Sequence, residues 1–203
     1  MDYPPFKIGE RFRIIAPTTP PTSDDRIDLI MQRGAFGSGE HETTVSCLEA
    51  MEGMEQIKGA RLLDLGSGTG ILALAALKLG AEHAVCVDIE ASAVETAKIN
   101  CQLNGVEDKV SHIVGTLEAV GEDQYDLILA NIYGDILLAL AQPLSALLKP
   151  GGIMLLSGIL WEYNFEVRQA YQRQGCTVVR NRMLPEFSTV VLEKKPQPRT
   201  AGV

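Results

Sequence analysis

The sequence lacks any apolar run close to the roughly 20 residues that a membrane-spanning helix needs. The longest candidate, Ile136 to Leu148, is interrupted by Gln142 and Pro143. A basic start followed by an apolar stretch is also missing, so we expect no secretory signal. These absences favour a cytoplasmic protein without a membrane partner.

Patterns that form disulfide frameworks or metal sites are missing as well. The 4 cysteines include no CxxC pair, and the 3 histidines stand far apart in the chain. We therefore expect buried free thiols and no metal site. The residues concerned are Cys47, Cys86, Cys101, Cys176, His41, His83 and His112.

Positive charge is not in excess, because 26 acidic residues outnumber 18 basic ones and the net charge is −8. Sequence-independent binding to nucleic acid depends on Lys and Arg side chains that neutralise phosphates. We therefore expect no direct nucleic-acid partner. The acidic balance suits a basic protein partner, although surplus acid also serves solubility alone. The oligomeric state is left open.

From residue 40 onward the sequence alternates between short apolar strands and helical segments, which predicts a parallel sheet covered by helices on both faces. The last two strands have no helix between them, so they should pair antiparallel. This is an α/β fold, the Rossmann-like seven-stranded arrangement of methyltransferases, with an antiparallel C-terminal hairpin strand. The predicted strands are 60–65, 84–89, 109–114, 125–132, 152–160, 176–184 and 188–194, and the predicted helices are 42–56, 69–79, 91–103, 135–148 and 161–174.

A glycine-rich turn, LLDLGSGTG, joins the first of these strands to a helix. Its glycines allow a sharp turn close to a ligand, and ligands of such sheets bind beyond the carboxyl ends of the strands. The dinucleotide fingerprint GxGxxG needs a third glycine where this chain has Ile71. An acid two residues before the first glycine suits a cation better than a pyrophosphate. The pattern favours S-adenosylmethionine, and the residues predicted to bind it here are Asp64, Gly66, Ser67 and Gly68.

Further candidates for the cofactor site follow the next three strands. Asp88 lies about 20 residues past the glycines, where an acid can accept hydrogen bonds from ribose hydroxyls, and Ile89 follows it. The alternative for Asp88 is a helix N-cap. Thr116 and Leu117 stand where adenine would lie, or belong to an ordinary loop. Asn131 could hold the amino-acid part of the cofactor or orient an amine, unless it only forms a turn.

Several segments together resemble the PrmA-type ribosomal protein methyltransferases, from about Ile27 to Glu193. They are AFGSGEHETT, LLDLGSGTGILALAALKLGA, VDIEASAV, NCQLNGV, DLILANI and LLKPGGIMLLSGIL. The resemblance implies methylation of amino groups on protein eleven of the large ribosomal subunit, with S-adenosylmethionine as methyl donor. It places the cofactor positions on Thr44, Gly66, Asp88 and Asn131. It also makes AFGSGEHETT part of the site, with Phe36 on the cofactor and His41 beside the acceptor.

The chain also departs from this family. The family carries a separate N-terminal domain that presents the ribosomal substrate, whereas about thirty residues precede the motif here. Arg33 stands where glycine is usual, and Glu42 where proline is usual. We therefore expect the catalytic domain only: an N-terminal extension over 1–40 packed on the core, an S-adenosylmethionine-dependent methyltransferase domain over 41–195 and a disordered tail over 196–203.

Three classes of function stay open. The first is a methyltransferase acting on amines of a protein or of a small molecule, with His41 and Asn131 as catalytic candidates. The second is a nicotinamide- or nucleotide-binding enzyme, which Ile71 disfavours. The third is a non-catalytic protein that binds the cofactor or a partner. Methyl transfer mainly requires that the protein position the acceptor. No obvious general base stands out in the sequence. His41 or Glu40 could relay a proton, and helix-start packing is the alternative for His41.

Overall fold

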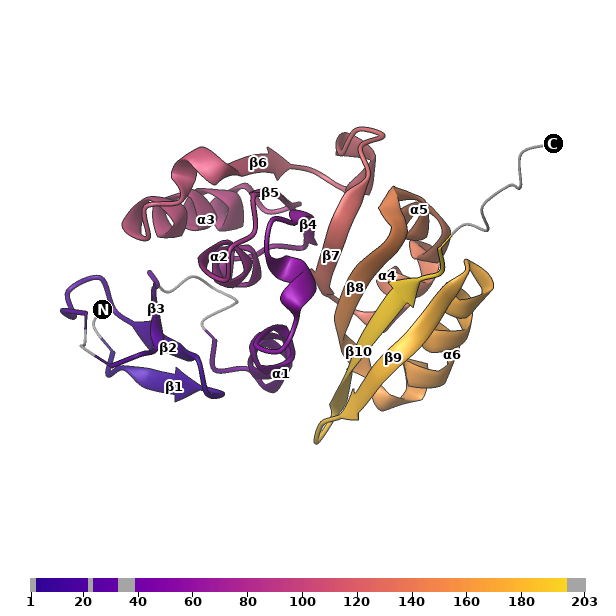
Figure 1. Cartoon of the computed structure of the whole chain (residues 1–203), viewed down its shortest axis with the longest axis horizontal. Helices are drawn as coiled ribbons and strands as arrows, with labels where there is room; N and C mark the ends of the chain where they lie inside the picture. Colours follow the sequence, from indigo (N-terminus) through magenta and orange to yellow (C-terminus); the bar gives the residue numbers. More distant parts are fainter. Residues whose placement is uncertain (1–2, 22–23, 33–38, 197–203) are drawn as a thin grey trace.

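The computed structural model describes residues 3–21, 24–32 and 39–196 (Figure 1). A seven-stranded sheet forms its centre. The strands lie in the order β6 (Val110–Val114), β5 (His83–Asp88), β4 (Arg61–Leu65), β7 (Tyr125–Asn131), β8 (Leu148–Leu160), β10 (Phe187–Lys194) and β9 (Cys176–Met183). All neighbours pair in parallel except β10, which is antiparallel to both β8 and β9. The predicted α/β fold with an antiparallel C-terminal hairpin is confirmed.

Helices cover both faces of this sheet. They are α1 (Glu42–Met51), α2 (Ile71–Lys78), α3 (Ala91–Leu103), α4 (Gly134–Ala139), α5 (Ala141–Leu147) and α6 (Trp161–Arg173), with short 3-10 helices at Glu55–Ile57, Glu107–Lys109 and Leu117–Ala119. Adjacent residues of β4 point to opposite faces: Leu62 joins the core under α1, α2 and α3, and Leu63 joins the core under α4, α5 and α6. Burial on both faces explains the nearly continuous apolar strands.

One predicted helix, over 135–148, is wrong because the chain forms α4 and α5 with a break at Leu140. Pro143 stands in the first turn of α5. Proline has no N–H to donate to the carbonyl four residues earlier, and its ring clashes with that carbonyl. An uninterrupted helix through this position is therefore unfavourable.

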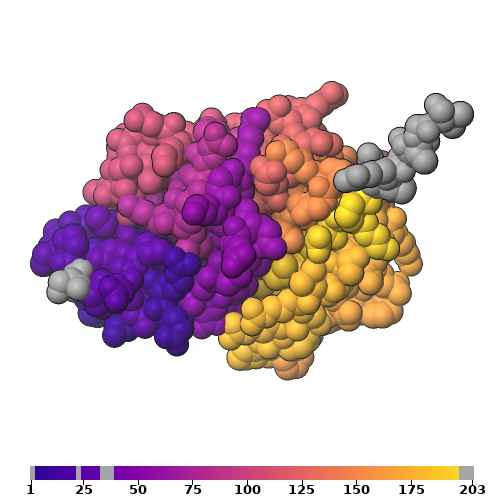
Figure 2. Space-filling view, viewed as in Figure 1, coloured from indigo at the N-terminus to yellow at the C-terminus, as the bar shows by residue number. Residues whose placement is uncertain are grey.

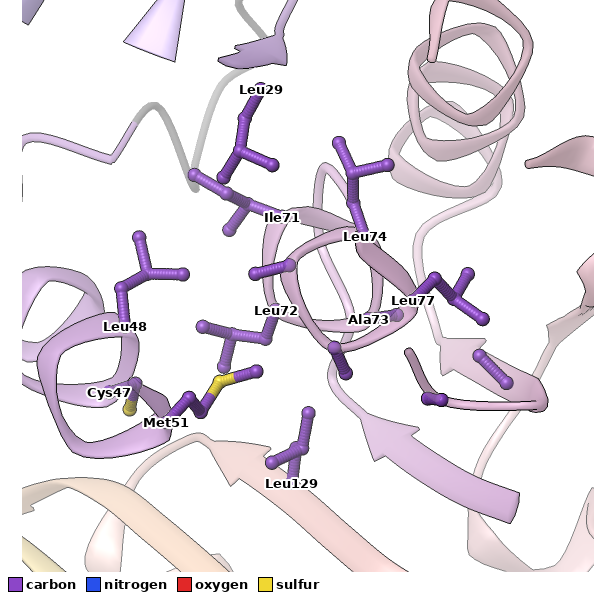
Figure 3. Close-up of a cluster of buried hydrophobic side chains, with 14 of the residues drawn as sticks. Leu29, Cys47, Leu48, Met51, Ile71, Leu72, Ala73, Leu74, Leu77 and Leu129 are labelled. Carbon is purple, nitrogen blue, oxygen red and sulfur yellow. The ribbon is translucent and has the colours of Figure 1, made fainter. Parts of the chain in front are cut away.

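A second sheet precedes the central one, with β2 (Phe12–Ile15) between β1 (Phe6–Ile8) and β3 (Ile27–Ile30). Of these three strands, β2 is the one with a strand-like sequence, within RFRIIAP. This sheet shares a core with the helices that follow: Leu29 lies near Ile71, and Leu48 reaches the same cluster from α1 (Figure 3). In Figure 2 the indigo N-terminal residues lie against the purple residues that follow them. The boundary at residue 40 stays a prediction.

Three further expectations concern the cysteines, membrane-spanning helices and positions near the ends of the described ranges. All four cysteines are free and buried, as expected. Within the described ranges, no helix has both the length and the apolar composition needed to cross a bilayer. The positions Arg33 and Phe36 lie outside the described residues, and so does 197–203, which makes up most of the expected tail.

The strand order reverses between β4 and β7, since the chain runs outward from β4 to β6 and then returns to start β7 on the other side of β4. In open parallel sheets the crevice beyond the carboxyl ends of the strands, at such a reversal, is where ligands bind. The turn after β4 and the residues after β7 therefore meet at the place where the fold offers a site.

Candidate active site

The glycine turn after β4 needs its glycines for two reasons. Gly66, Gly68 and Gly70 have φ values of +70°, +53° and +77°, the left-handed region that L side chains rarely adopt. A Cβ atom would also clash with the Ile132 side chain at Gly66, and at Gly70 it would lie 3.1 Å from the Cβ of Ala97. The turn thus packs against Ile132, directly after β7, on one side and against α3 on the other.

Asp88 holds the same turn from the end of β5. Its Oδ2 accepts a 2.7 Å hydrogen bond from the Gly68 N–H, and its Oδ1 accepts one of 3.0 Å from the Glu90 N–H. The N-cap of α3 is Glu90, so Asp88 is not the cap itself. Each carboxylate oxygen has a further lone pair, which leaves Asp88 able to accept from hydroxyl groups. Its contact with a ribose stays a prediction.

Asp64 lies beneath the glycine turn, and its predicted contact with the ligand stays a prediction. The residue is only 1% exposed, and its Oδ2 accepts a 3.0 Å hydrogen bond from the Ala73 N–H in the first turn of α2. Burial raises the pKa of Asp64 to about 7, with the charge of Asp88 adding to the rise and the Ala73 bond opposing it. Asp64 therefore supports the start of α2 from beneath the glycine turn.

The residues predicted around adenine lie in different environments. The Thr116 hydroxyl donates a short hydrogen bond to the Glu118 carboxylate. Leu117 is 7% exposed and belongs to the core. Ile89, directly after Asp88, is 68% exposed and offers apolar surface beside that carboxylate. Ile89 therefore offers more exposed apolar surface than Leu117, and its role at the base stays a prediction.

Two residues 87 positions apart meet at the switch point. The Asn131 Nδ2, at the end of β7, donates a 3.4 Å hydrogen bond to the Thr44 Oγ1 on α1. Gly158 of β8 has φ +79°, and a Cβ there would lie 3.2 Å from the Asn131 Oδ1 and 2.6 Å from the Ile132 carbonyl oxygen. The backbone of β8 thus passes close to the amide of Asn131. This hydrogen bond joins Thr44, the last residue of AFGSGEHETT, to the LANI motif, and a common site for the two motifs stays a prediction.

The start of α1 is bonded to the turn between β9 and β10. His41 is exposed and caps the helix, since its Nδ1 lies 2.8 Å from the Thr43 Oγ1 and accepts from the Thr43 N–H at 3.4 Å. Its ring meets Phe187 edge-on, at 5.4 Å between centroids. The Glu42 Oε1 accepts from the N–H groups of Glu186 and Phe187, at 3.2 and 3.3 Å. The packing alternative for His41 is thus observed, and its catalytic role stays a prediction.

Sequence reasoning missed Asn100, which lies within the quoted segment NCQLNGV. It is fully buried on α3, and its Nδ2 donates a 3.0 Å hydrogen bond to the Thr69 carbonyl in the glycine turn. An asparagine in the middle of a helix pattern is the available signal, because a polar side chain there needs a partner when it is buried.

The strand order, the glycine turn at its reversal and the acid that ends β5 together define a Rossmann-like methyltransferase fold. Solved structures agree with this class. A ribosomal protein L11 methylase from Lactobacillus delbrueckii subsp. bulgaricus has a TM-score of 0.85 and 26% identity over 96% of this chain and 100% of its own. A T. thermophilus 16S rRNA methyltransferase in complex with AdoMet and guanosine has a TM-score of 0.64 at 22% identity, over 76% of this chain and 43% of its own, and shows likeness of fold alone.

Residues 1–195 match the family model of the ribosomal protein L11 methyltransferases (PrmA), and the chain belongs to this family. The ribosomal protein L11 methyltransferase of Pseudomonas putida (strain W619) is 42% identical over 171 residues, which cover 84% of this chain. That of Bacillus velezensis is 35% identical over 195 residues, or 95% of this chain. The matched regions make up 58% and 62% of these relatives, so the chain spans about three fifths of their length.

Proposed function

We propose that this chain is an S-adenosylmethionine-dependent methyltransferase domain that methylates an amino group of a protein. One observation carries the proposal: the glycine turn, Asp88 and the Thr44–Asn131 pair stand together at the carboxyl edge where the strand order reverses. Ligands of this fold class bind at such an edge. The family to which the chain belongs gives the reaction class.

The residues present fit the cofactor. Gly66 and Gly68 carry no side chain where they turn the backbone, so a ligand can approach the backbone itself at these two residues. The carboxylate of Asp88 has acceptor capacity for the two ribose hydroxyls, and Ile89 has apolar surface for the base. When bound, S-adenosylmethionine supplies a methyl group on a positively charged sulfur. No phosphate has to be accommodated beside the buried acid of the turn.

The chain's own part in the reaction is to position the amine. We propose that the Asn131 Oδ1 accepts a hydrogen bond from the acceptor N–H, while the Nδ2 stays on Thr44 and fixes the amide orientation. A lysine amine must first lose its proton, whose ordinary pKa is about 10.4. Burial beside a cation lowers that pKa and favours the neutral, nucleophilic form.

For the acceptor we propose a basic protein, and ribosomal protein L11 as the first to test. The relatives carry that protein in their names. The chain's net charge of −8 suits a partner of opposite charge. A ribosomal protein as acceptor also places the reaction in the cytoplasm, which stays part of the proposal.

The test has two stages. Titration calorimetry with S-adenosylmethionine and with NADH should give binding of the first only. Purified ribosomal protein L11 is then incubated with methyl-labelled S-adenosylmethionine, and label in the lysine or N-terminal amine supports the acceptor assignment. The control variant is Asp135→Ala, which changes an exposed acid of α4. It should bind S-adenosylmethionine and transfer label as the parent chain does. If S-adenosylmethionine does not bind, the proposed function is wrong. If it binds but no label reaches L11, only the proposal of L11 as acceptor is wrong.

A further inference from the structure

The outer edge of β3 is closed by side chains of α3. The Asn104 Oδ1 accepts from the Ile30 N–H at 3.0 Å, and its Nδ2 donates to the Ile30 carbonyl at 2.7 Å. The Asn100 Oδ1 accepts from the Gln32 N–H at 2.7 Å, and its Nδ2 donates to the Gln32 carbonyl at 3.4 Å. A side-chain amide carries the same donor and acceptor as a peptide group. The two amides therefore satisfy residues 30 and 32 in place of a neighbouring strand.

The two asparagines differ in what else they reach. The Asn104 Nδ2 makes its second hydrogen bond to the Asn100 carbonyl, 2.8 Å away within the same helix. The Asn100 Nδ2 donates to the carbonyl of Thr69 at 3.0 Å. Thr69 lies in the glycine turn, between Gly68 and Gly70, and is 2% exposed. Of these two asparagines, Asn100 is therefore the one that joins Gln32, just past the end of β3, to the turn.

The helix that carries Asn100 also contacts the turn directly. Gly70 packs against Ala97. Ala97 lies about one helical turn before Asn100 on the same helix. The turn thus meets α3 at two points, one apolar and one hydrogen-bonded. Asn100 is fully buried, so no water replaces a lost partner without a change in structure.

We propose that Asn100 is a positioning residue of the cofactor site. Its one amide fixes the Thr69 carbonyl relative to the backbone of Gln32, so the glycine turn and the end of the N-terminal sheet are held in one geometry. This inference rests on the proposed function, because it takes the glycine turn to be the place where S-adenosylmethionine binds. The N-terminal sheet is then a support of the site and not an appendage to it.

The test compares two isosteric variants, Asn100→Asp and Asn104→Asp. Each keeps an acceptor for the β3 backbone and removes the amide donor, and each places a carboxylate at a buried position. Only Asn100→Asp removes a hydrogen bond to the glycine turn. Titration calorimetry should show a dissociation constant for S-adenosylmethionine raised about tenfold in Asn100→Asp, because a displaced glycine turn loses about one hydrogen bond's worth of contact with the ligand. In Asn104→Asp the dissociation constant should stay within about twofold of the value for the parent chain.

Asn100→Ser and Asn104→Ser form a second, uncharged pair for use where the aspartates do not fold. Urea unfolding of each variant gives the loss of stability, and this loss is expected to be similar within a pair. A merely structural role predicts equal changes in affinity within a pair, and that result overturns the proposal. An unchanged affinity in both Asn100 variants also overturns it. If the parent chain itself does not bind S-adenosylmethionine, the proposed function has failed instead.

Discussion

The buried carboxyl group of Asp64 makes the stability of this fold depend on pH. Asp64 is 1% exposed and lies beneath the glycine turn, with one hydrogen bond from the Ala73 N–H. Its pKa rises from an ordinary value of 3.8 to about 7, chiefly because burial disfavours the charged form. Since one pKa unit corresponds to about 1.36 kcal/mol, keeping this group ionised in the folded chain costs about 4 kcal/mol.

The sign follows from comparing the two states. Below pH 3.8 the carboxyl is protonated in both folded and unfolded chains, and it adds no penalty. Between pH 3.8 and about 7 the unfolded chain releases the proton while the folded chain keeps it, so the free energy of unfolding falls as pH rises. Above about pH 7 the whole penalty is present.

The variant Asp64→Asn removes the titration and keeps an oxygen for the Ala73 N–H. We expect it to be more stable than the parent by about 4 kcal/mol at pH 8, and by much less at pH 4.5. Urea unfolding of both proteins at a series of pH values measures this difference. The control is Asp135→Asn, the same substitution at an exposed position of α4. An Asp64→Asn difference that is the same at pH 4.5 and pH 8 would refute the reasoning.

Three further predictions use the same site and its core. Gly66→Ala should abolish binding of S-adenosylmethionine in calorimetry and destabilise the fold by about 1–3 kcal/mol, because its φ of +70° is strained for alanine. Asp88→Ala leaves the Gly68 N–H without its acceptor and should weaken that binding about tenfold or more, and unchanged affinity would contradict the ribose assignment. Tyr171→Phe removes the hydroxyl that donates to the Leu137 carbonyl at 3.0 Å, and urea unfolding should show a loss of about 1–3 kcal/mol.

The central sheet could be predicted from the sequence because its evidence is local. Apolar strands buried on both faces, helices between them and a final pair of strands without a helix fix most of the strand directions. The glycine turn was recognisable for the same reason, since its glycines are neighbours in the chain. The strand around Ile27–Ile30 was missed because four residues beside a proline-rich loop give little periodic signal.

The site residues show where local reasoning stops. The glycine motif points to Asp64 as a site residue, but its hydrogen bond from the Ala73 N–H could not be predicted, because it depends on how α2 packs on β4. Glu42 was noted only as an unusual residue, and its bonds to residues 186 and 187 depend on how the last strands return to α1. Contacts between positions more than 140 residues apart follow from the complete fold, which no short motif encodes.

The position of β10 has a consequence for how this chain is made. Although Phe187–Lys194 comes last among the strands, it lies inside the sheet, between β8 and the edge strand β9. A ribosome releases residues from the N-terminus onward. Until about residue 194 has emerged, β8 has an unpaired edge and β9 has no neighbouring strand. Glu42 also lacks the N–H groups that it accepts from in the folded chain. The domain therefore completes its sheet only after β10 has emerged, and a nascent chain arrested before that point exposes strand edges that attract chaperones or other chains.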